Sequence, residues 1–552
     1  MPERGPVFVT LTVYFFRRFF ENDVIQATGD TVTTIVRALS IAAAPGLMLA
    51  FFLQNQYPQR TAWGRIEDQY FFVLYSMLVM AGVAIFEWEM LFPDTLDFLV
   101  LSPLPLRGRD TLAAKATALG LFLGLFLFAA NVFGVFMLPA VSKEHFWRTA
   151  WAQCLAVTCS GAFGAFAILA AGGILICILP ARTFRILSPI MQALVVAVLG
   201  LLLVSYARFG DSLDKTLQIP LGHALWVPSF WFLGIYEHAL RGHSAAPFAA
   251  PMMRSGIRAI SIAFVLAVAT YPLAWARMRK MAIEGTTGLR SRPAVPLNRL
   301  VAGIVPLPAR RAVTYFIGQT IARNSKYQVY LAMYCGTGLA LAIACAVTFV
   351  SSGSGLRPAL SIDGLHAVMP LMLFWIVAGL RMAFALPLNL PARWVFRVTG
   401  AEREACISAT RVWAFACGLA ALAMLLPILW IAGLSARALL VQAITGACVC
   451  AVLVDSLLFA NHGIPFAQPR SPGKTSLPLM LTLFTGILPL FCVAMVRAEL
   501  WLERKPLWLL ASVIVVPAAY GVIGILRSRS QARLEDGDEI EGEFLLLGLG
   551  VD

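Results

Sequence analysis

The sequence has 552 residues, of which 59% are hydrophobic and 13% are charged. Soluble domains carry about 25% charged residues, so this composition excludes an ordinary soluble protein and indicates a polytopic membrane protein. The formal net charge is +14, but Lys and Arg gather in the segments on one side of the apolar runs. This bias sets orientation in a membrane, and no nucleic-acid partner is expected.

The chain begins with a predicted interfacial helix. In "TLTVYFFRRFFENDVI", Thr10 to Ile25, an aromatic stretch carries Arg17 and Arg18. Such a segment suits an amphipathic helix with its apolar face in lipid and its arginines at the headgroups. Because the arginines follow the apolar stretch, no cleavable signal peptide is expected. A similar stretch, Ala312 to Tyr327, stands ahead of the second half of the chain.

Apolar segments long enough to cross the membrane, which takes about 20 residues, fall into two groups of six. The predicted spans are 32–53, 69–90, 112–139, 150–179, 186–206, 256–276, 327–350, 364–386, 410–434, 437–460, 476–497 and 506–526. The predicted fold is an all-α polytopic membrane protein of about 12 transmembrane helices, as two parallel six-helix repeats, each preceded by an interfacial amphipathic helix. Both halves then have the same orientation.

Four regions follow from this layout. Residues 1–277 form the first six-span half, 278–311 a basic cytoplasmic linker containing Gly and Pro, 312–527 the second half, and 528–552 an acidic cytoplasmic tail. The basic linker suits contact with anionic membrane lipids. By the positive-inside rule we expect both termini of this multi-pass protein to be cytoplasmic. The expected location is a bacterial inner membrane.

The segment between the second and third spans, Phe92 to Ala116, is more apolar than a simple connection needs to be. Its centre reads "LDFLVLSPL" and its end reads "RGRDTLAAKA", where Asp110 suits the first turn of a helix. One interpretation is an interfacial helix that rests in lipid. The other is a short helix that presents apolar side chains to a groove on a partner protein while arginines fix its orientation. The residues for that contact are Leu96, Phe98, Leu99, Leu101, Arg107 and Arg109.

Two further features lie in or near the spans. Asp455 is the carboxylate placed most clearly inside a predicted span, and ionisable residues at such depth are functional candidates by default. It is a candidate pathway residue, and the alternative is a packing carboxylate paired with a neighbouring helix. The aromatic segment His223 to Gly242 is too polar at its ends for a crossing, which predicts a re-entrant or interfacial helix on the outer side.

The sequence contains no signature of catalysis or cofactor binding. It has no GxxxxGK[ST] phosphate loop, no HExxH or GxSxG pattern and no CxxC pair. We therefore assign no catalytic, cofactor or metal residue, and the chain is not expected to hydrolyse ATP by itself.

In two stretches the chain resembles the membrane subunits of type-2 ABC exporters, the ABC-2 permeases. These are "VYFFRRFFENDV", as the connecting helix, and "FLVLSPLPLRGRDTLAAKA", in which an apolar stretch runs into Leu-Pro, a basic residue and a helix carrying Ala-Lys. The resemblance implies a translocation pathway powered by a separate ABC ATPase subunit, in one or two copies. The segment after the second span would be the coupling helix, which adds Asp110 and Lys115 to the contact. By the repeat, Trp394, Arg397 and Arg403 would serve the second half.

Other functions and assemblies remain open. An ion-coupled secondary transporter would need intramembrane carboxylates, which are scarce here, and an integral membrane enzyme or assembly scaffold would need His, Asp or Glu clustered at one depth. A single chain supplies both halves of a pathway, and a homodimer of such chains is the alternative assembly.

Overall fold

The computed structural model describes most of the chain. The described residues are 4–20, 31–56, 60–92, 97, 101, 103–142, 145–209, 213, 217, 224–284, 303, 308–352, 355–385, 403–458, 465–466, 477–505, 508, 518 and 520–522. The chain divides into two compact units, Met1–Arg292 (unit 1) and Pro293–Asp552 (unit 2). The division falls within the predicted linker, 278–311. Residues 285–302 of this linker and the predicted tail, 528–552, lie outside the described residues.

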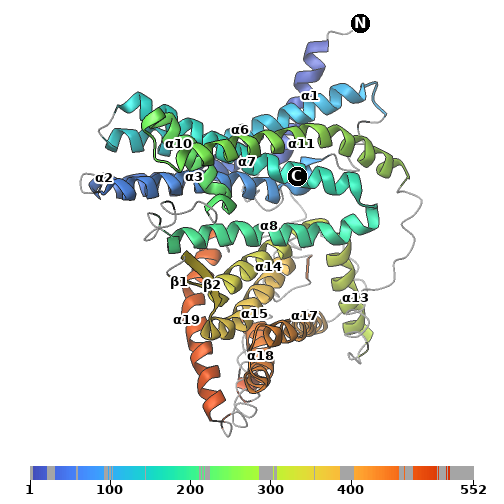
Figure 1. Cartoon of the computed structure of the whole chain (residues 1–552). Coiled ribbons are helices and arrows are strands. Elements are labelled where there is room, and N and C mark those ends of the chain that lie inside the picture. The colour runs from blue at the N-terminus through green and yellow to red at the C-terminus, as the bar shows by residue number, and fades with distance from the viewer. Residues whose placement is uncertain are drawn as a thin grey trace, which may run out of the picture. The chain divides into compact units, whose positions relative to one another are not determined.

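Unit 1 is built from helices (Figure 1). Their bounds are α1 Arg4–Phe20, α2 Thr31–Gln56, α3 Ala62–Phe86, α4 Trp88–Leu91, α6 Gly108–Ser142, α7 Phe146–Ile178, α8 Ala181–Phe209, η3 Ala224–Trp226, α10 Pro228–Arg241, η4 Gly242–Ser244 and α11 Ala249–Glu284. Helix α3 packs on α7 and α6, α11 packs on α7, and both α1 and α2 pack on α6.

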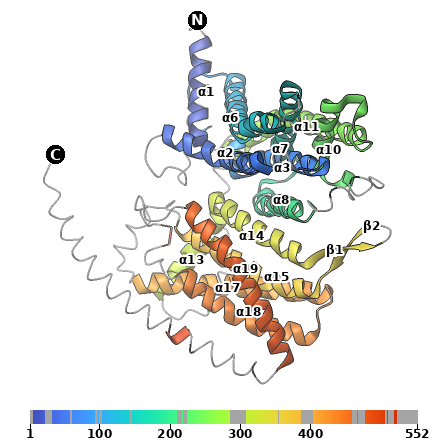
Figure 2. The same cartoon turned by 90° about the vertical axis from the view of Figure 1, so that its left-hand side faces the viewer.

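Unit 2 adds a hairpin to its helices, as Figure 2 shows. Its elements are α13 Pro308–Arg323, α14 Ser325–Ala346, β1 Val347–Ser352, β2 Gly355–Leu360, α15 Ile362–Ala385, α17 Arg403–Ile431, α18 Ala436–Leu457 and α19 Leu477–Arg504. Helix α15 packs on α14, α17, α18 and α19, and α13 packs on α17. Helix α15 is therefore the centre of this unit.

Among the described residues, ten helices are long and apolar enough to cross a membrane. They are Ile35–Leu53, Ala62–Phe86, Gly108–Val141, Phe146–Ile178, Ile186–Tyr206, Ala249–Lys280, Tyr327–Ala346, Ile362–Ala385, Ala405–Ile431 and Ala436–Leu457. The prediction of a helical multi-pass membrane protein is confirmed at this level. The eleventh predicted span, 476–497, is helical from Leu477 onward as part of helix α19, Leu477–Arg504. The twelfth, 506–526, lies almost wholly outside the described residues.

The outer surfaces of these helices are apolar, as lipid requires. Phe51 of α2 is 67% exposed, Ile190 of α8 is 55% exposed and Val265 of α11 is 62% exposed. Exposing large apolar side chains to this extent along whole helices is energetically unfavourable in water, whereas contact with lipid hydrocarbon is favourable. These helices therefore present lipid-facing surfaces.

Helix α3 starts seven residues before its predicted span, 69–90, because its first turn is capped. The Thr61 hydroxyl accepts a hydrogen bond from the Gly64 N–H at 3.1 Å. Arg60, just outside the span, donates to a carboxylate oxygen of Asp68 at 2.6 Å. This hydrogen bond raises the pKa of the Arg60 guanidinium, so Arg60 anchors the start of α3 as a permanent cation.

Small residues allow α3 and α7 to approach closely. A Cβ atom on Gly164 would lie 2.7 Å from the Met77 carbonyl oxygen, and one on Gly161 would lie 2.6 Å from the Ser76 hydroxyl. The Ser76 hydroxyl donates to the Val157 carbonyl oxygen at 2.7 Å. Packing through glycine and hydrogen bonds from serine are the interactions that join helices inside a bilayer, where apolar contact alone gives little drive.

The hairpin in unit 2 shortens a predicted span. The seventh predicted span, 327–350, ends as a helix at Ala346, and the chain continues as strand β1. The two strands pair antiparallel from Val347 opposite Leu360 to Ser352 opposite Gly355. The residues after Ala346 read "VTFV", and branched and aromatic side chains favour a strand over a helix once the chain leaves the membrane.

The predicted segment 223–242 contains helix α10, which packs on α11, α7 and α3 of unit 1 and lies beside α11 in Figure 2. It ends at Gly242, whose φ of 57° lies in the left-handed region that suits glycine. A Cβ atom on Gly234 would lie 2.8 Å from the Ala249 carbonyl oxygen of α11. The hydroxyls of Tyr70 and Ser229 are 2.9 Å apart, which ties α10 to α3. The segment is thus a packed part of the bundle and not a solvated loop.

The glycine contact between α3 and α7 yields the first prediction. Gly164→Val should destabilise the protein by about 1–3 kcal/mol, because the added methyl groups force the α3 backbone away. Thermal unfolding of the purified chain in detergent measures this loss. The matched control is Gly120→Val, since a Cβ atom at Gly120 meets nothing within 4 Å. Equal melting temperatures for the two variants would contradict the proposed close packing.

Candidate functional site

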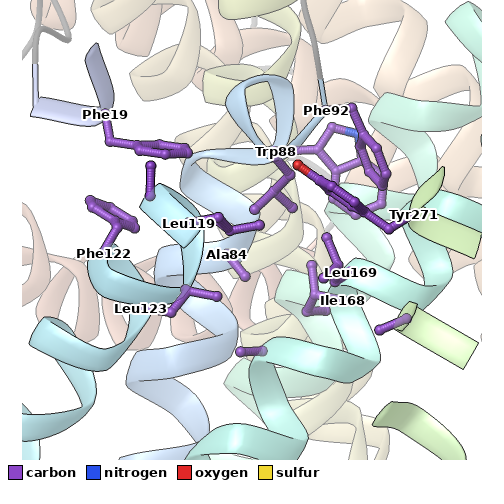
Figure 3. Packing of buried hydrophobic residues seen from close by; sticks show 14 of the residues in the cluster. Phe19, Ala84, Trp88, Phe92, Leu119, Phe122, Leu123, Ile168, Leu169 and Tyr271 are labelled. Atoms are coloured by element: carbon purple, nitrogen blue, oxygen red, sulfur yellow. The ribbon is translucent and has the colours of Figure 1, made fainter. Parts of the chain in front are cut away.

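Helix α1 is amphipathic and packs its aromatic face on α6. Phe15 and Phe19, one turn apart, are 2% and 3% exposed, whereas Val9 is 59% exposed. The Phe19 ring stacks on the Phe122 ring of α6 with a centroid distance of 4.8 Å, as Figure 3 shows. The aromatic face that was predicted to lie in lipid is instead packed on α6, because the rings of Phe122 and its neighbours offer it an apolar surface within the protein.

A second group of aromatic residues fixes the end of the second span. Phe92, just after α4, is 3% exposed, and its ring centroid lies 5.6 Å from that of Tyr271 on α11. Trp88 lies beside them in the same cluster (Figure 3). This packing holds the Phe92 carbonyl in place at the point where the segment Phe92 to Ala116 begins.

Three charged residues meet beside this aromatic packing, and we call them the Asp97 ion cluster: Arg18, Asp97 and Lys115. The Lys115 ammonium lies 2.8 Å from one Asp97 oxygen and donates to the Phe92 carbonyl at 3.0 Å. Arg18 of α1, predicted to lie at the lipid headgroups, instead pairs with Asp97 by donating to its other oxygen. The ammonium also lies 5.4 Å from the centre of the Phe15 ring, within the range of a cation–π contact.

The Asp97 ion cluster is almost fully buried. The side chains of Asp97 and Lys115 are 2% and 3% exposed, and that of Arg18 is 18% exposed. Breaking a buried ion pair by removing one partner typically costs about 3–5 kcal/mol, because the other charge is left without compensation. The cluster therefore joins α1, the segment after the second span and the start of α6 into one body.

The predicted contact residues divide between surface and interior. Arg107, Arg109 and Asp110 are exposed at the start of α6, and Leu101 is partly buried. Lys115 is buried in the Asp97 ion cluster, so it can position this segment but presents no surface to a partner protein. Leu96, Phe98 and Leu99 lie outside the described residues.

In unit 2, Trp394 and Arg397 lie outside the described residues, and Arg403 is the first residue of α17. Arg411 and Asp455 are 6% and 1% exposed. The Arg411 Nε lies 3.3 Å from an Asp455 carboxylate oxygen. This pairing between α17 and α18 supports the packing interpretation of Asp455 over a pathway role.

Phe466 joins the ends of several unit 2 helices. It is fully buried, and its φ of 65° is unusual for a residue with a side chain, a conformation that costs about 1–3 kcal/mol. Its N–H donates to the Phe384 carbonyl of α15 at 3.0 Å. The centroid of its ring lies 4.6 Å from that of the Tyr327 ring of α14 and 6.0 Å from that of the Phe316 ring of α13. Helix α13 is thus anchored by aromatic packing, as α1 is in unit 1.

One buried polar cluster contains residues that the sequence analysis did not single out. His366 of α15, Gln442 and Thr445 of α18 and Glu499 of α19 meet inside unit 2. His366 and Glu499 each lie two residues from the end of a predicted span, where polar residues are usually taken as interfacial. The sequence did offer one signal: a histidine at one end of the eighth predicted span and a glutamate at one end of the eleventh, on the same predicted side of the membrane.

Among the described residues, no group of three or more His, Cys, Asp or Glu side chains is arranged to hold a metal ion. Comparisons with models of protein families, with curated proteins and with solved structures find no match for this chain. The inference of function therefore rests on the fold and on the charged clusters.

The Asp97 ion cluster gives the second prediction. Asp97→Asn should lower the free energy of unfolding by about 3–5 kcal/mol, because Lys115 would stay buried without its counter-charge. Chemical or thermal unfolding in detergent measures the loss. Asp110→Asn, at an exposed carboxylate of the same segment, is the matched control and should change stability by less than about 0.5 kcal/mol. A wild-type melting temperature for Asp97→Asn would show that the cluster is not a structural element.

Proposed function

We propose that this chain is the membrane subunit of an ATP-driven exporter of the ABC-2 type. Its two halves form the translocation pathway, and a separate ABC ATPase subunit supplies the energy. The observation that carries the proposal is the Asp97 ion cluster, which ties Asp97, in the segment after the second span, to both α1 and α6. A subunit driven from outside needs such an element, because a flexible loop would absorb the displacement imposed by its partner.

The surface next to the cluster suits a partner protein. Leu104 is 49% exposed, and Arg107 and Arg109 are exposed directly after it. An apolar side chain flanked by cations can enter a groove while the charges set the orientation. A buried ion cluster beneath such a surface keeps the surface fixed relative to the membrane helices.

Shared helix pairings support a parallel repeat of two halves. In unit 1, α6 packs on α1, α3 and α7, and α3 packs on α7; in unit 2, α17 packs on α13, α15 and α18, and α15 packs on α18. Lys115 near the start of α6 and Arg411 near the start of α17 are both buried beside a carboxylate. Both halves would offer an ATPase contact, so one or two ATPase copies bind, and a homodimer of the chain is not needed to complete a pathway.

The expected setting is a bacterial inner membrane with both termini in the cytoplasm. The distribution of Lys and Arg along the sequence supports this orientation. In this orientation α1 and the Asp97 ion cluster would lie on the cytoplasmic side, where an ATPase would bind, and helix α10 would lie on the opposite side.

An ion-coupled secondary transporter is the second candidate, and one observation favours it. Glu499 and His366 form a buried acid–base pair, 1% and 2% exposed, within unit 2, and such pairs serve proton relays in transporters. Transport that depends on a proton gradient and continues without ATP would select this candidate over the exporter.

The exporter proposal predicts the effect of reversing one exposed charge. Arg109→Glu should reduce co-purification of an ABC ATPase with the chain by on the order of tenfold, because a contact that orients the partner becomes repulsive. Affinity purification from membranes of the native host, with mass spectrometry of a partner that carries a phosphate loop, measures this. Insertion into the membrane should not change.

The control for this experiment is Arg148→Glu, which reverses an exposed arginine at the start of α7, at the other end of the predicted spans. It should leave co-purification at the wild-type level. Equal recovery of the ATPase with Arg109→Glu and with Arg148→Glu would contradict the proposed coupling surface. Absence of any ABC ATPase from the wild-type preparation would contradict the exporter proposal itself.

A further inference from the structure

The buried polar cluster of unit 2 is not part of the proposed coupling surface, and its side chains carry both an acid and a base. Four residues form it: His366, Gln442, Thr445 and Glu499, contributed by the three packed helices α15, α18 and α19. All four are 6% exposed or less. A lone ionised carboxylate in such a place is strongly unfavourable, and it requires either a counter-charge or a proton.

In the Glu499 carboxylate, Oε2 has two nitrogen neighbours, whereas Oε1 has only a hydroxyl whose hydrogen is already used elsewhere. His366 Nδ1 and Gln442 Nε2 lie 3.3 Å and 3.4 Å from Oε2. Thr445 Oγ1 lies 3.4 Å from Oε1, but it also lies 2.8 Å from the Val441 carbonyl oxygen. A hydroxyl has one hydrogen, and Thr445 donates it to the Val441 carbonyl oxygen, which is the nearer acceptor. A proton on Oε1 could instead be donated to Thr445 Oγ1, which would satisfy both groups.

The Gln442 amide can serve both protonation states of Glu499. The residue is fully buried, and within the described part of the chain its Oε1 has no hydrogen-bond partner. As placed, its NH₂ group donates to the carboxylate. A half turn of the amide would exchange the two ends and offer Oε1 as an acceptor to a protonated Glu499.

The second nitrogen of His366 connects the cluster to the helix ends. Nε2 lies 3.9 Å from Oε2 of Glu503, one turn beyond Glu499 on α19. The Glu503 side chain is 27% exposed, and its other oxygen lies 3.4 Å from the hydroxyl of Ser435, the N-cap of α18. A small rotation of Glu503, or one bridging water, closes the gap to hydrogen-bond distance. The imidazole thus stands between a solvent-accessible carboxylate and a buried one.

The other charged groups near this end of the helices lie at the exposed surface. They are Asp363 in the first turn of α15, Arg437 on α18, and Arg497, Arg504 and Lys505 on or just after α19. Solvent screens groups in such positions. Arg381 of α15 and Asp455 of α18 lie several turns away, near the other ends of their helices. The charge inside the cluster is therefore governed chiefly by His366, Glu499 and Glu503.

We propose that Glu499 binds a proton that enters through Glu503 and His366 from the membrane face where α15 and α18 begin. A proton from solvent first binds the Glu503 carboxylate and then passes to Nε2 of the neutral imidazole. The imidazolium releases its Nδ1 proton to Oε2 of Glu499. The new hydroxyl then turns toward the Gln442 amide or, after a half turn of the carboxyl group, toward Thr445 Oγ1. His366 is left neutral with its hydrogen on Nε2, Glu503 is again ionised, and the cluster has gained one proton.

This inference goes beyond the exporter proposal and holds whichever of the two proposed functions is correct. In an exporter the site would make the packing of α19 on α15 and α18 sensitive to pH on one side of the membrane. In a secondary transporter it would carry the coupling ion. Because it needs no ATPase, its test is separate from the co-purification experiment.

Infrared difference spectroscopy on the full chain in lipid bilayers tests the proton site. Lowering the pH from about 8 to about 3, a range that includes the ordinary pKa values of both imidazole and carboxyl groups, should produce a C=O stretching band of a protonated, buried carboxylic acid. The band should vanish in Glu499→Gln and shift in Glu499→Asp, which keeps an acid with a shorter side chain. Asp455→Asn, at a buried carboxylate paired with Arg411, is the matched control and should keep the band.

The entry route is tested by the rate of the same signal. After a pH jump, Glu503→Gln and His366→Phe should form the Glu499 band several-fold more slowly than the wild type, because each removes one carrier of the proton. Retention of the full band in folded Glu499→Gln, its absence in the wild type, or its loss only in Asp455→Asn would overturn the proton site. Unchanged rates in both Glu503→Gln and His366→Phe would overturn the route.

Discussion

A charged side chain inside a membrane protein needs a counter-charge or a proton, and this constraint organises both units. Lys115 meets Asp97 in unit 1, while Arg411 meets Asp455 and His366 meets Glu499 in unit 2. Each pair joins different elements, so each charge is tolerated only in the packed state. The apolar faces turned toward lipid give the helices little preference for one neighbour over another, and the buried pairs, with glycine contacts such as Gly164 on Met77, supply that preference.

The same constraint explains what the sequence could predict. Apolar runs of about 20 residues predict helices regardless of what they touch, and most helices lie within a few residues of the predicted spans. The start of α3 at Ala62 and the strand after Ala346 differ because a local cap and branched residues decided those ends. The helix at the start of the chain, α1, could be predicted from its own sequence, since its aromatic residues and arginines are close neighbours along the chain.

The charged clusters were only partly predictable, because each brings together residues that are far apart in the sequence. Arg18 and Asp97 are 79 positions apart, and His366 and Glu499 are 133 positions apart. A single residue shows its type but not its partner. Lys115 was therefore expected at a contact surface, but it lies in the interior. His366 and Glu499 were not singled out, because polar residues are common at the ends of membrane spans. Asp455 was noticed because it stands alone in an apolar run, and Arg411 then proved to be beside it.

The bond between the Lys115 ammonium and the Phe92 carbonyl closes a loop of the chain. The two residues lie 23 positions apart, and their contact, rather than the stretch between them, fixes both ends of the loop. Within the stretch, the exposed residues Leu104, Arg107 and Arg109 take no part in this closure. These positions can change while the buried contacts keep the membrane bundle in its form. A scaffold of this kind lets the recognition of a partner evolve separately from the fold that responds to it.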